Sequence, residues 1–379
     1  FPRMGRSTNV IGGTVYPNAF FRLGIEAPPN TPAVAIKTPV SINATLTTSS
    51  GSSVLTVTTA SDHGAAVGQY VTLAGFGAQN AVPADDINQT HKIATVPSAT
   101  TLTVEVPVSA TGASTSGTIS DGATFKGLAD QLPDFSTSYV YTFVSAYGEE
   151  GPPSAASTVI TTDDNATITV SNLSTAGAKS NNNFGSGAGT KRIYRSNTGS
   201  NTTAFQFVAE VAMATTSYDD TSNNDELSEI IPSTYWIAPP DDDSSTYPDG
   251  PMKGLTAMPN GVMAGFTGKR ICFSEKFLPH AWPTSYRLTL EDPIVGIASI
   301  GNGLIVTTEG RPYLIAGTDP ASMSALRMET PQACLSKTSI VDLGTVVLYA
   351  GTEGLVAAAG NNVQTITEGL ITPDQWQSE

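Results

Sequence analysis

The chain has little of the chemistry on which most enzymes and metal proteins depend. Its 379 residues include two Cys and three His, and charged residues make up 13% of the total. Cys272 and Cys334 form no C-x-x-C pair and show no metal-ligand spacing, so we predict no metal site. We expect two buried free thiols, and one disulfide between neighbouring repeats is the alternative.

Long apolar runs are also missing. No stretch approaches the roughly 20 apolar residues of a membrane-crossing helix, so we predict no membrane span. No signal peptide is visible. The chain begins at Phe1 rather than Met, which is compatible with an earlier segment that was removed or left out.

Basic residues are scarce and scattered. Lys and Arg together number 18 against 33 Asp and Glu, which gives a formal charge of −15. The two adjacent basic pairs, Lys191-Arg192 and Lys269-Arg270, both lie inside strand-like runs. Nucleic-acid binding requires clustered Lys and Arg. We therefore expect that DNA can pass close to this protein without being bound.

Familiar catalytic groupings are absent from the sequence. A Ser-His-Asp site would need His63, His91 or His280, and none of them lies beside a G-x-S-x-G turn. We expect each to satisfy a turn, with His63 hydrogen-bonded to the backbone. The Gly-rich stretch 185–189 does not join a strand to a helix, so it predicts a flexible loop rather than a phosphate site. We predict no catalytic residue, no cofactor and no enzyme activity.

A glycosidase is the enzymatic alternative. Glycosidase propellers place carboxylates across a central cleft, and Glu275, Glu291, Asp292 and Glu309 are the candidates here. The S-x-D-x-G-x-T-W phrase of sialidases does not occur.

Helix-breaking residues are abundant, and they indicate the fold class. With 35 Gly and 25 Pro, few windows can hold a long helix. We predict an all-β chain with two small sandwich or barrel domains and a partial or open β-propeller-like C-terminal region. The predicted parts are an N-terminal arm or strand with a Pro-rich linker (1–37), a small barrel or sandwich (38–125), a second sandwich (126–232) and propeller-like blades (233–379).

Short runs with alternating Thr, Val and aromatic residues predict the strands of the first two domains. In the first domain they cover 54–58, 70–73, 91–96 and 101–106. In the second they cover 139–147, 159–161, 166–170, 191–196, 205–211 and 216–220, with a flexible loop at 176–190.

An acidic connector follows the second domain. Pro239 and Pro240 precede three consecutive Asp at 241–243, which lack the spaced ligands of a calcium loop. We expect a solvated linker here.

One phrase then occurs three times: a Gly, an apolar run, a Gly-containing turn and a second apolar run. The copies are 260–266 before Gly268, 302–306 before Gly310 and 344–349 before Gly354. Their leading glycines lie 42 and 41 residues apart. A period of about 40 to 50 residues made of short strands is typical of β-propeller blades.

Three stretches resemble bacteriophage structural proteins. Residues 62–75, with the turn His63-Gly64, resemble a small module that recurs in phage structural proteins. A region of about 100 residues is similar to the fibronectin type III-like domains of phage tail proteins. The segments that carry this similarity are "YVYTFVSAYGEEGPPS", "RIYRS", "FQFVAEV" and "TSYDD". "ICFSE" followed by "PHAWP" resembles the propeller of podovirus tail nozzle (tail tubular) proteins over about 130 residues.

These resemblances imply a structural virion protein of a short-tailed phage tail, assembled in the host cytoplasm. The family forms homo-oligomeric rings, here a hexamer by resemblance, that contact adaptor and fibre proteins and let genomic DNA pass through a channel. The acidic composition suits such a channel. The alternative is a secreted or surface β-rich adhesin or carbohydrate-binding protein. Three repeats are fewer than the four to eight blades of a closed propeller, so we expect something further to complete the set.

Overall fold

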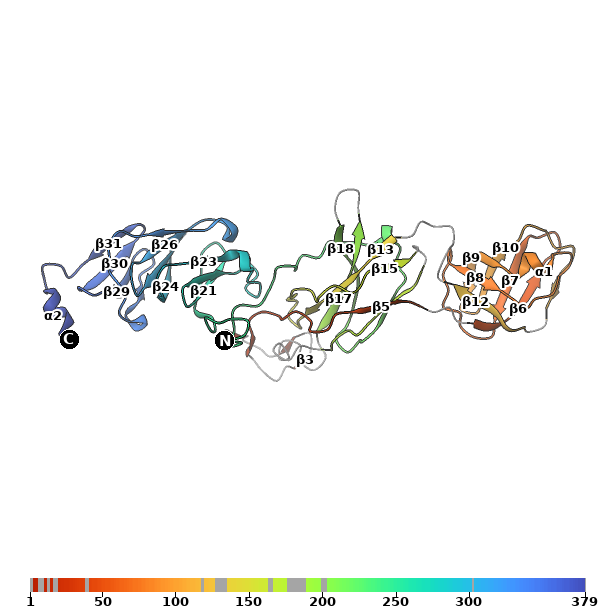
Figure 1. Cartoon of the computed structure of the whole chain (residues 1–379), viewed down its shortest axis with the longest axis horizontal. Helices are drawn as coiled ribbons and strands as arrows, with labels where there is room; N and C mark the ends of the chain where they lie inside the picture. The colour runs from red at the N-terminus through yellow and green to blue at the C-terminus, as the bar shows by residue number, and fades with distance from the viewer. Residues whose placement is uncertain are drawn as a thin grey trace.

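The computed structural model describes most of the chain. The described residues are 3–5, 10–11, 14–15, 20–37, 41–116, 119–126, 135–162, 166–175, 189–198, 203–301 and 303–378. Figure 1 shows three β-rich parts in a row along the longest axis of the molecule. The all-β prediction is confirmed, because the described helices are single short turns among many strands.

The first part is a closed sheet. It contains β6 (Ser41–Thr48), β7 (Val54–Thr59), β8 (Tyr70–Leu73), β9 (Thr90–Ser98), β10 (Thr101–Glu105), β11 (Ser114–Thr115) and β12 (Ile119–Lys126), with the one-turn helix α1 (Ala84–Ile87). The strand order is β11-β6-β12-β8-β9-β10-β7, and an additional β6–β7 pairing closes the sheet. The four predicted strands of this region are confirmed, whereas β6, β11 and β12 were missed.

Alternation of side chains builds the core of this closed sheet. Leu46, Leu55, Val57, Leu102 and Val104 point inward and are fully buried, and the Thr residues between them lie on the outer side. Strands with a period of two bury one face and leave the other to solvent.

The second part consists of short sheets around an aromatic core. Its strands are β5 (Ala33–Ile36), β13 (Phe135–Thr137), β14 (Tyr139–Val144), β15 (Ile160–Thr162), β16 (Ile168–Ser171), β17 (Thr190–Thr198), β18 (Thr203–Ala212) and β19 (Tyr218–Asp220), followed by the 3₁₀ turn η2 (Asn224–Glu226). The sheets are β14-β17-β18, β19-β16-β5 and β13-β15. Tyr139, Tyr141 and Phe143 of β14 lie in its core.

All six predicted strands of this part are confirmed, with shifted ends. β14 is shorter than predicted, because the chain turns at Ser145 and Gly148 (φ 79°) before Glu150 pairs back with Val144. Most of the predicted flexible loop at 176–190, including 185–188 of its Gly-rich stretch, lies outside the described residues.

The N-terminal segment takes part in this second part. β5 pairs with β16 over Ala33–Ile36, and Ile25 lies in the aromatic core. Nearer the start of the chain, β1 (Arg3–Gly5) pairs with β4 (Phe20–Arg22), and β2 (Val10–Ile11) pairs with β3 (Thr14–Val15). The segment predicted as an arm therefore supplies an edge strand to a sheet formed from residues far along the chain.

The third part contains three antiparallel sheets of four strands each, which we call the first, second and third stacked sheets. The first is β20 (Lys253–Ala257), β21 (Met263–Thr267), β22 (Arg270–Phe273) and β23 (Arg287–Thr289). The second is β24 (Ile294–Ile300), β25 (Gly303–Thr308), β26 (Tyr313–Ala316) and β27 (Ser324–Arg327). The third is β28 (Val341–Asp342), β29 (Val347–Ala350), β30 (Leu355–Ala359) and β31 (Asn362–Thr365).

Short turns connect and end these sheets. They are the 3₁₀ turns η3 (Thr284–Tyr286), η4 (Pro320–Ser322) and η5 (Lys337–Ser339), and the last helix α2 (Pro373–Gln377). Each copy of the repeated phrase forms the second strand of one sheet, and the turn glycines Gly268, Gly310 and Gly354 follow that strand. The repeat in the sequence is thus a repeat of supersecondary structure.

The three sheets stack face to face. Leu304 and Val306 of β25 lie in an apolar cluster with residues of the first sheet, such as Phe266. Ile305, between them in sequence, lies in a different cluster with Val347 and Tyr349 of the third sheet. The second sheet is therefore buried on both faces, as the interior member of a stack must be.

A packed joint connects the second part to the first stacked sheet, where we expected a solvated linker. Arg22 and Asp241 form a buried ion pair, and their side chains are 8% and 4% exposed. Leu23 lies in a cluster with Met252, Cys272 and Trp282 on the first sheet. The linker expectation was wrong for Asp241, because the N-terminal segment returns to this point and covers it.

Candidate functional site

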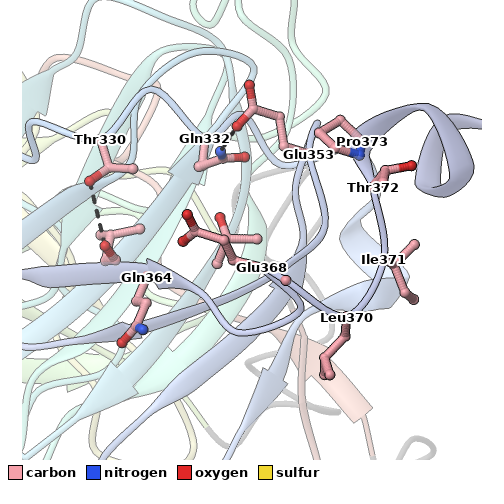
Figure 2. A pocket seen from close by; sticks show the side chains of 12 residues that line it. Thr330, Gln332, Glu353, Gln364, Glu368, Leu370, Ile371, Thr372 and Pro373 are labelled. Carbon is pink, nitrogen blue, oxygen red and sulfur yellow. Dashed lines mark hydrogen bonds between the residues drawn. The ribbon is translucent and has the colours of Figure 1, made fainter.

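One candidate site is a pocket beside the last strand of the third stacked sheet. Its volume is about 580 Å³, which lies within the usual range for ligand pockets. In Figure 2, Thr330 and Gln332 lie on one side of the pocket, and Leu370, Ile371, Thr372 and Pro373 lie on the other. The remaining lining comes from Glu353, Val363, Gln364, Thr365, Glu368 and Gly369. We call this feature the edge pocket.

Buried hydrogen bonds hold one wall of the edge pocket. Gln332 is 4% exposed, and its Nε2 donates to Glu353 Oε2 at 2.9 Å while its Oε1 accepts from Thr352 Oγ1 at 3.3 Å. Its backbone carbonyl accepts from the Tyr349 hydroxyl at 3.0 Å. Burial raises the pKa of Tyr349, so that hydroxyl remains a donor at any ordinary pH.

A tight turn and a capped helix hold the other wall. Gly354 has φ 151°, and a Cβ there would meet Thr367 Oγ1 at 2.2 Å, so a side chain would disturb this turn. Thr372 caps α2 by accepting from Gln375 N, and Trp376 Nε1 donates to the Gly351 carbonyl at 2.9 Å. The chain is thereby folded back beside β31.

The edge pocket carries negative charge. Glu353 and Glu368 contribute carboxylates, and the twelve described lining residues include no Lys, Arg or His. Leu370 is 81% exposed and Ile371 is 40% exposed, so an apolar rim borders the acidic lining. The combination fits a ligand with positive charge and some apolar surface.

A second candidate surface is the outer face of the third stacked sheet. Val341, Leu348, Ala357 and Gln364 are paired across its four strands and so share one face. The apolar cluster between the second and third sheets contains Val347, Val356 and Val363, which alternate with these residues. The described residues therefore leave a largely uncharged sheet face without a further sheet against it.

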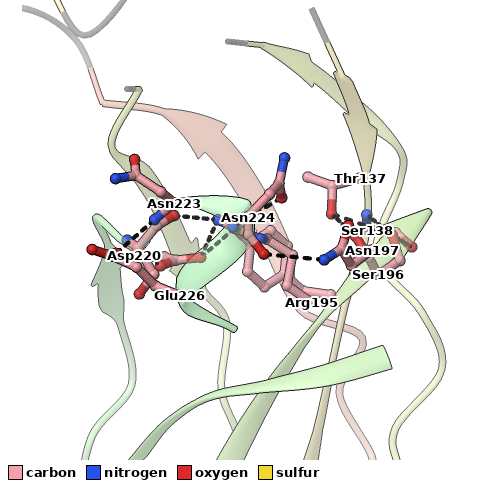
Figure 3. Close-up of polar contacts among 11 residues, drawn as sticks. Thr137, Ser138, Arg195, Ser196, Asn197, Asp220, Asn223, Asn224 and Glu226 are labelled. Atoms are coloured by element: carbon pink, nitrogen blue, oxygen red, sulfur yellow. Dashed lines mark hydrogen bonds and ion pairs between the residues drawn. The ribbon is translucent and has the colours of Figure 1, made fainter. Parts of the chain in front are cut away.

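A buried ion pair lies in the second part, and Figure 3 shows Arg195 and Asp220 among their polar neighbours. Arg195 Nη1 donates to Asp220 Oδ2 at 2.9 Å, and the side chains are 2% and 0% exposed. Asp220 also accepts from the Tyr139 hydroxyl at 2.7 Å, and Arg195 donates to Asn224 Oδ1 at 3.1 Å. Burial, and then the neighbouring Asp220 charge, raises the pKa of Tyr139. These side chains bond mainly to one another, which is typical of a structural network, and Arg195 Nε is buried without a hydrogen-bond partner among the described residues.

A second polar cluster lies where the second part meets the joint. Glu150 Oε1 accepts from Thr142, Tyr194 and Ser233 at 2.8, 2.7 and 3.2 Å, and its Oε2 accepts from Arg192 at 3.1 Å. The backbone of Glu150 also shares a hydrogen bond with His280 of the first stacked sheet region. Burial lowers the pKa of His280 to about 4, so this ring is neutral near pH 7.

The structure keeps the three histidines apart. His63 Nδ1 accepts from Ala65 N at 3.0 Å in a turn, which confirms the expected backbone bond. His91 Nε2 lies 2.9 Å from the Ile87 carbonyl. His280 stacks edge-on against Trp236, with 5.9 Å between ring centroids.

The carboxylates proposed for a glycosidase are engaged separately. Glu275 accepts from the Tyr286 hydroxyl at 2.9 Å, and Glu291 accepts from Arg327 at 2.6 Å. Asp292 lies beside Gly310, and Glu309 is exposed. Cys272 and Cys334 are both free and buried, and burial raises the pKa of the Cys272 thiol to about 11.

Two further observations concern metals and membranes. Within the described ranges, no group of three or more His, Cys, Asp or Glu side chains is placed to hold a metal ion. None of the helices in the part of the chain that the structure describes is long and apolar enough to cross a membrane.

Sequence reasoning did not find the edge pocket. Its lining comes from four separate stretches, at residues 330 and 332, 353, 363–365 and 368–373, and none has a catalytic spacing. The one signal in the sequence is the turn glycine Gly354, and a turn glycine does not indicate which residues pack beside the turn.

Comparisons with known proteins identify no family. No protein-family model matches the chain, and no curated protein matches it. Among solved structures, "Phage phi92 endosialidase" is similar over 84% of this chain, with 13% identity and a TM-score of 0.20. The chain spans 46% of that protein's length. A similarity at this TM-score supports no conclusion about fold or function.

Proposed function

We propose that this chain is a non-enzymatic structural component of a phage tail, of the nozzle or tail-tube ring kind. The observation that carries the proposal is the stack of three four-stranded antiparallel sheets, joined to two other β-rich parts. The sequence at 271–283 resembles tail nozzle proteins, and the sequence at 139–220 resembles fibronectin type III-like domains of phage tails. Together these resemblances imply a propeller body with additional sandwich domains. In this proposal the copies assemble as a homo-oligomeric ring around a DNA channel and contact adaptor and fibre proteins.

The stack supports assembly because its last sheet buries only one of its two faces among the described residues. Blades of a propeller bury both faces against neighbours. The second stacked sheet does so on both faces, and the first is covered on its far face by Leu23, Met252 and Trp282. The third sheet buries one face only, among the described residues, and its outer face carries Leu348 and Ala357.

The charge distribution supports passage of DNA without specific binding. Several basic side chains are held by carboxylates or backbone carbonyls: Arg22, Lys191, Arg192, Arg195, Lys269, Arg270, Arg311 and Arg327. The net charge of −15 disfavours retention of a phosphate backbone, which needs clustered Lys and Arg. An acidic channel would let DNA move through.

The described carboxylates also favour a non-enzymatic role. Catalytic carboxylates of glycosidases face one another across roughly 5 to 9.5 Å with substrate between them. Glu275 and Glu291 instead accept hydrogen bonds from Tyr286 and Arg327, and each is engaged with its own neighbour. Turnover of a polysaccharide that is lost on Glu309→Gln would overturn this part of the proposal.

Electron microscopy and native mass spectrometry of the purified chain test the proposal together. We expect a ring of identical copies with a central opening, and a mass that is a whole multiple of 39.2 kDa. A monodisperse monomer at every concentration, with no association with virions, would contradict it.

The second candidate is a carbohydrate-binding or adhesin role, and the edge pocket is the observation that favours it. Its Gln, Thr and Glu side chains offer donors and acceptors of the kind that recognise hydroxyl groups. However, the described aromatic residues lie mostly in cores, as Tyr139, Tyr141, Phe273 and Tyr349 do, rather than at loop tips. Specific binding on a glycan array would favour this second role.

A further inference from the structure

The last strand of the third stacked sheet has an open edge. β31 pairs with β30 on one side only, in the register Val356↔Thr365 to Ala359↔Asn362. Ile366 N donates to the Leu355 carbonyl at 2.8 Å in the same ladder. In an antiparallel ladder, hydrogen-bonded pairs alternate with non-hydrogen-bonded pairs. Counting from Ile366, the backbone N–H and C=O groups of Gln364 and Asn362 therefore point toward β30, and those of Val363 and Thr365 point away from it.

The outward groups of β31 are only partly used. The Thr365 carbonyl accepts from Glu368 N at 3.3 Å, and the Val363 carbonyl accepts from Thr330 Oγ1 at 3.5 Å. For the N–H groups of Val363 and Thr365, the described residues provide no acceptor. Unpaired edge N–H groups are the template on which another strand can add.

The edge pocket lies along this same edge. Val363, Gln364 and Thr365 of β31 line it, together with residues 369–373. Figure 2 shows Leu370 and Ile371 on the side opposite Gln364. A chain lying in the pocket would therefore have the edge of β31 on one flank and an apolar rim on the other.

Charge selects among possible occupants. Glu353 and Glu368 line the pocket, and no basic side chain lies among its described lining residues. The chain as a whole carries −15, so it offers long-range attraction to a basic segment. A neutral or acidic strand would gain the same backbone bonds without this attraction.

We propose that the edge pocket binds an extended, basic peptide segment of a partner protein, which adds as a strand to β31. In this mode the peptide backbone bonds to Val363 and Thr365, its Lys or Arg side chains lie near Glu353 and Glu368, and an apolar side chain contacts Leu370. Backbone bonds supply affinity and the side-chain contacts supply selectivity. The proposal rests on the third stacked sheet alone and does not require the tail function.

Selection from a library of random nine-residue peptides tests the proposal with the full chain. We expect enriched peptides that contain Lys or Arg, and no Pro at the central positions. Their affinity, measured by fluorescence anisotropy, should fall as salt is raised. No enrichment, or enrichment of acidic peptides, would overturn the proposal, as would a saccharide that competes for the same site with higher affinity.

A charge variant with a matched control tests the role of the two carboxylates. We expect Glu353→Gln with Glu368→Gln to weaken the selected peptide about tenfold or more. Glu105→Gln with Glu229→Gln changes the net charge equally at exposed positions outside the pocket lining and should leave the affinity unchanged. Equal affinities for the two double variants would contradict the proposal.

Backbone methylation of the peptide tests strand addition while leaving the protein intact. An added strand uses the N–H groups of alternate residues. N-methylation at every second residue in one register should abolish binding, and methylation in the other register should preserve it. The same loss in both registers, or in neither, would rule out strand addition.

Discussion

The second part and the stacked sheets differ in the side chains that they bury. The second part buries charged groups, among them Lys191, Arg195 and Asp220. The polar residues buried in the stacked sheets are uncharged Thr, Ser, His and Gln side chains. A buried ion network fixes one arrangement at a cost in desolvation, whereas stacked apolar faces need only a neighbour of suitable shape. The second part is therefore specified from within, and each stacked sheet depends on the next one.

The largest expected effect is the loss of the buried ion pair in the second part. Asp220→Ala leaves the Arg195 guanidinium buried without its carboxylate, which costs about 3–5 kcal/mol. Chemical denaturation followed by Tyr and Trp fluorescence measures the change.

Asp219→Ala is the matched control for that experiment. Asp219 is the neighbouring residue, and its partner Lys37 has a side chain that is 52% exposed, so we expect a loss of about 1 kcal/mol or less. Equal free energies of unfolding for the two variants would contradict the claim that the buried ion pair stabilises the second part more than an exposed pair does.

The stacked sheets should respond to the loss of apolar volume on every buried face. Leu304→Ala and Ile305→Ala face opposite neighbours, and each should cost about 2–5 kcal/mol. Leu348→Ala, on the outer face of the third sheet, should cost less than about 1.5 kcal/mol, because that side chain loses little buried area. A cost for Leu348→Ala that equals that for Ile305→Ala would show that something covers this face.

The joint between the two regions should be sensitive to acid through His280. Its folded pKa of about 4 lies below the ordinary value of 6.5, so the unfolded chain binds more protons between these values. The stabilisation is complete above about pH 6.5 and is lost as pH falls towards 4, by up to about 3 kcal/mol. His280→Phe should flatten this part of the pH profile of unfolding, and an unchanged slope would contradict the assignment.

The smallest effect concerns the buried thiols of the stacked sheets. Cys272 has a raised pKa and is 1% exposed, and Cys334 is 4% exposed, so neither should react with a thiol reagent in the folded protein at pH 8. Both should react after denaturation. Rapid labelling of either thiol in the native state would show that the stack opens locally.

The sequence predicted most of what depends on local pattern. Alternation at 101–106 and the glycine period through Gly268, Gly310 and Gly354 located strands and sheets, because these signals involve neighbouring residues. Strand β5 and the Arg22–Asp241 pair were not predicted, since each joins residues more than 100 positions apart. The edge pocket was missed for the same reason: Gln332, Glu353 and Glu368 carry no spacing that identifies a site.

Immunogold electron microscopy of virions from the cell that encodes this chain tests the central proposal most directly. An antibody raised against the stacked sheets should place gold particles at the tail, and virions made without the chain should lack a complete tail. Intact, unlabelled virions, with the chain recovered only from the cell surface or the medium, would contradict the proposed tail function.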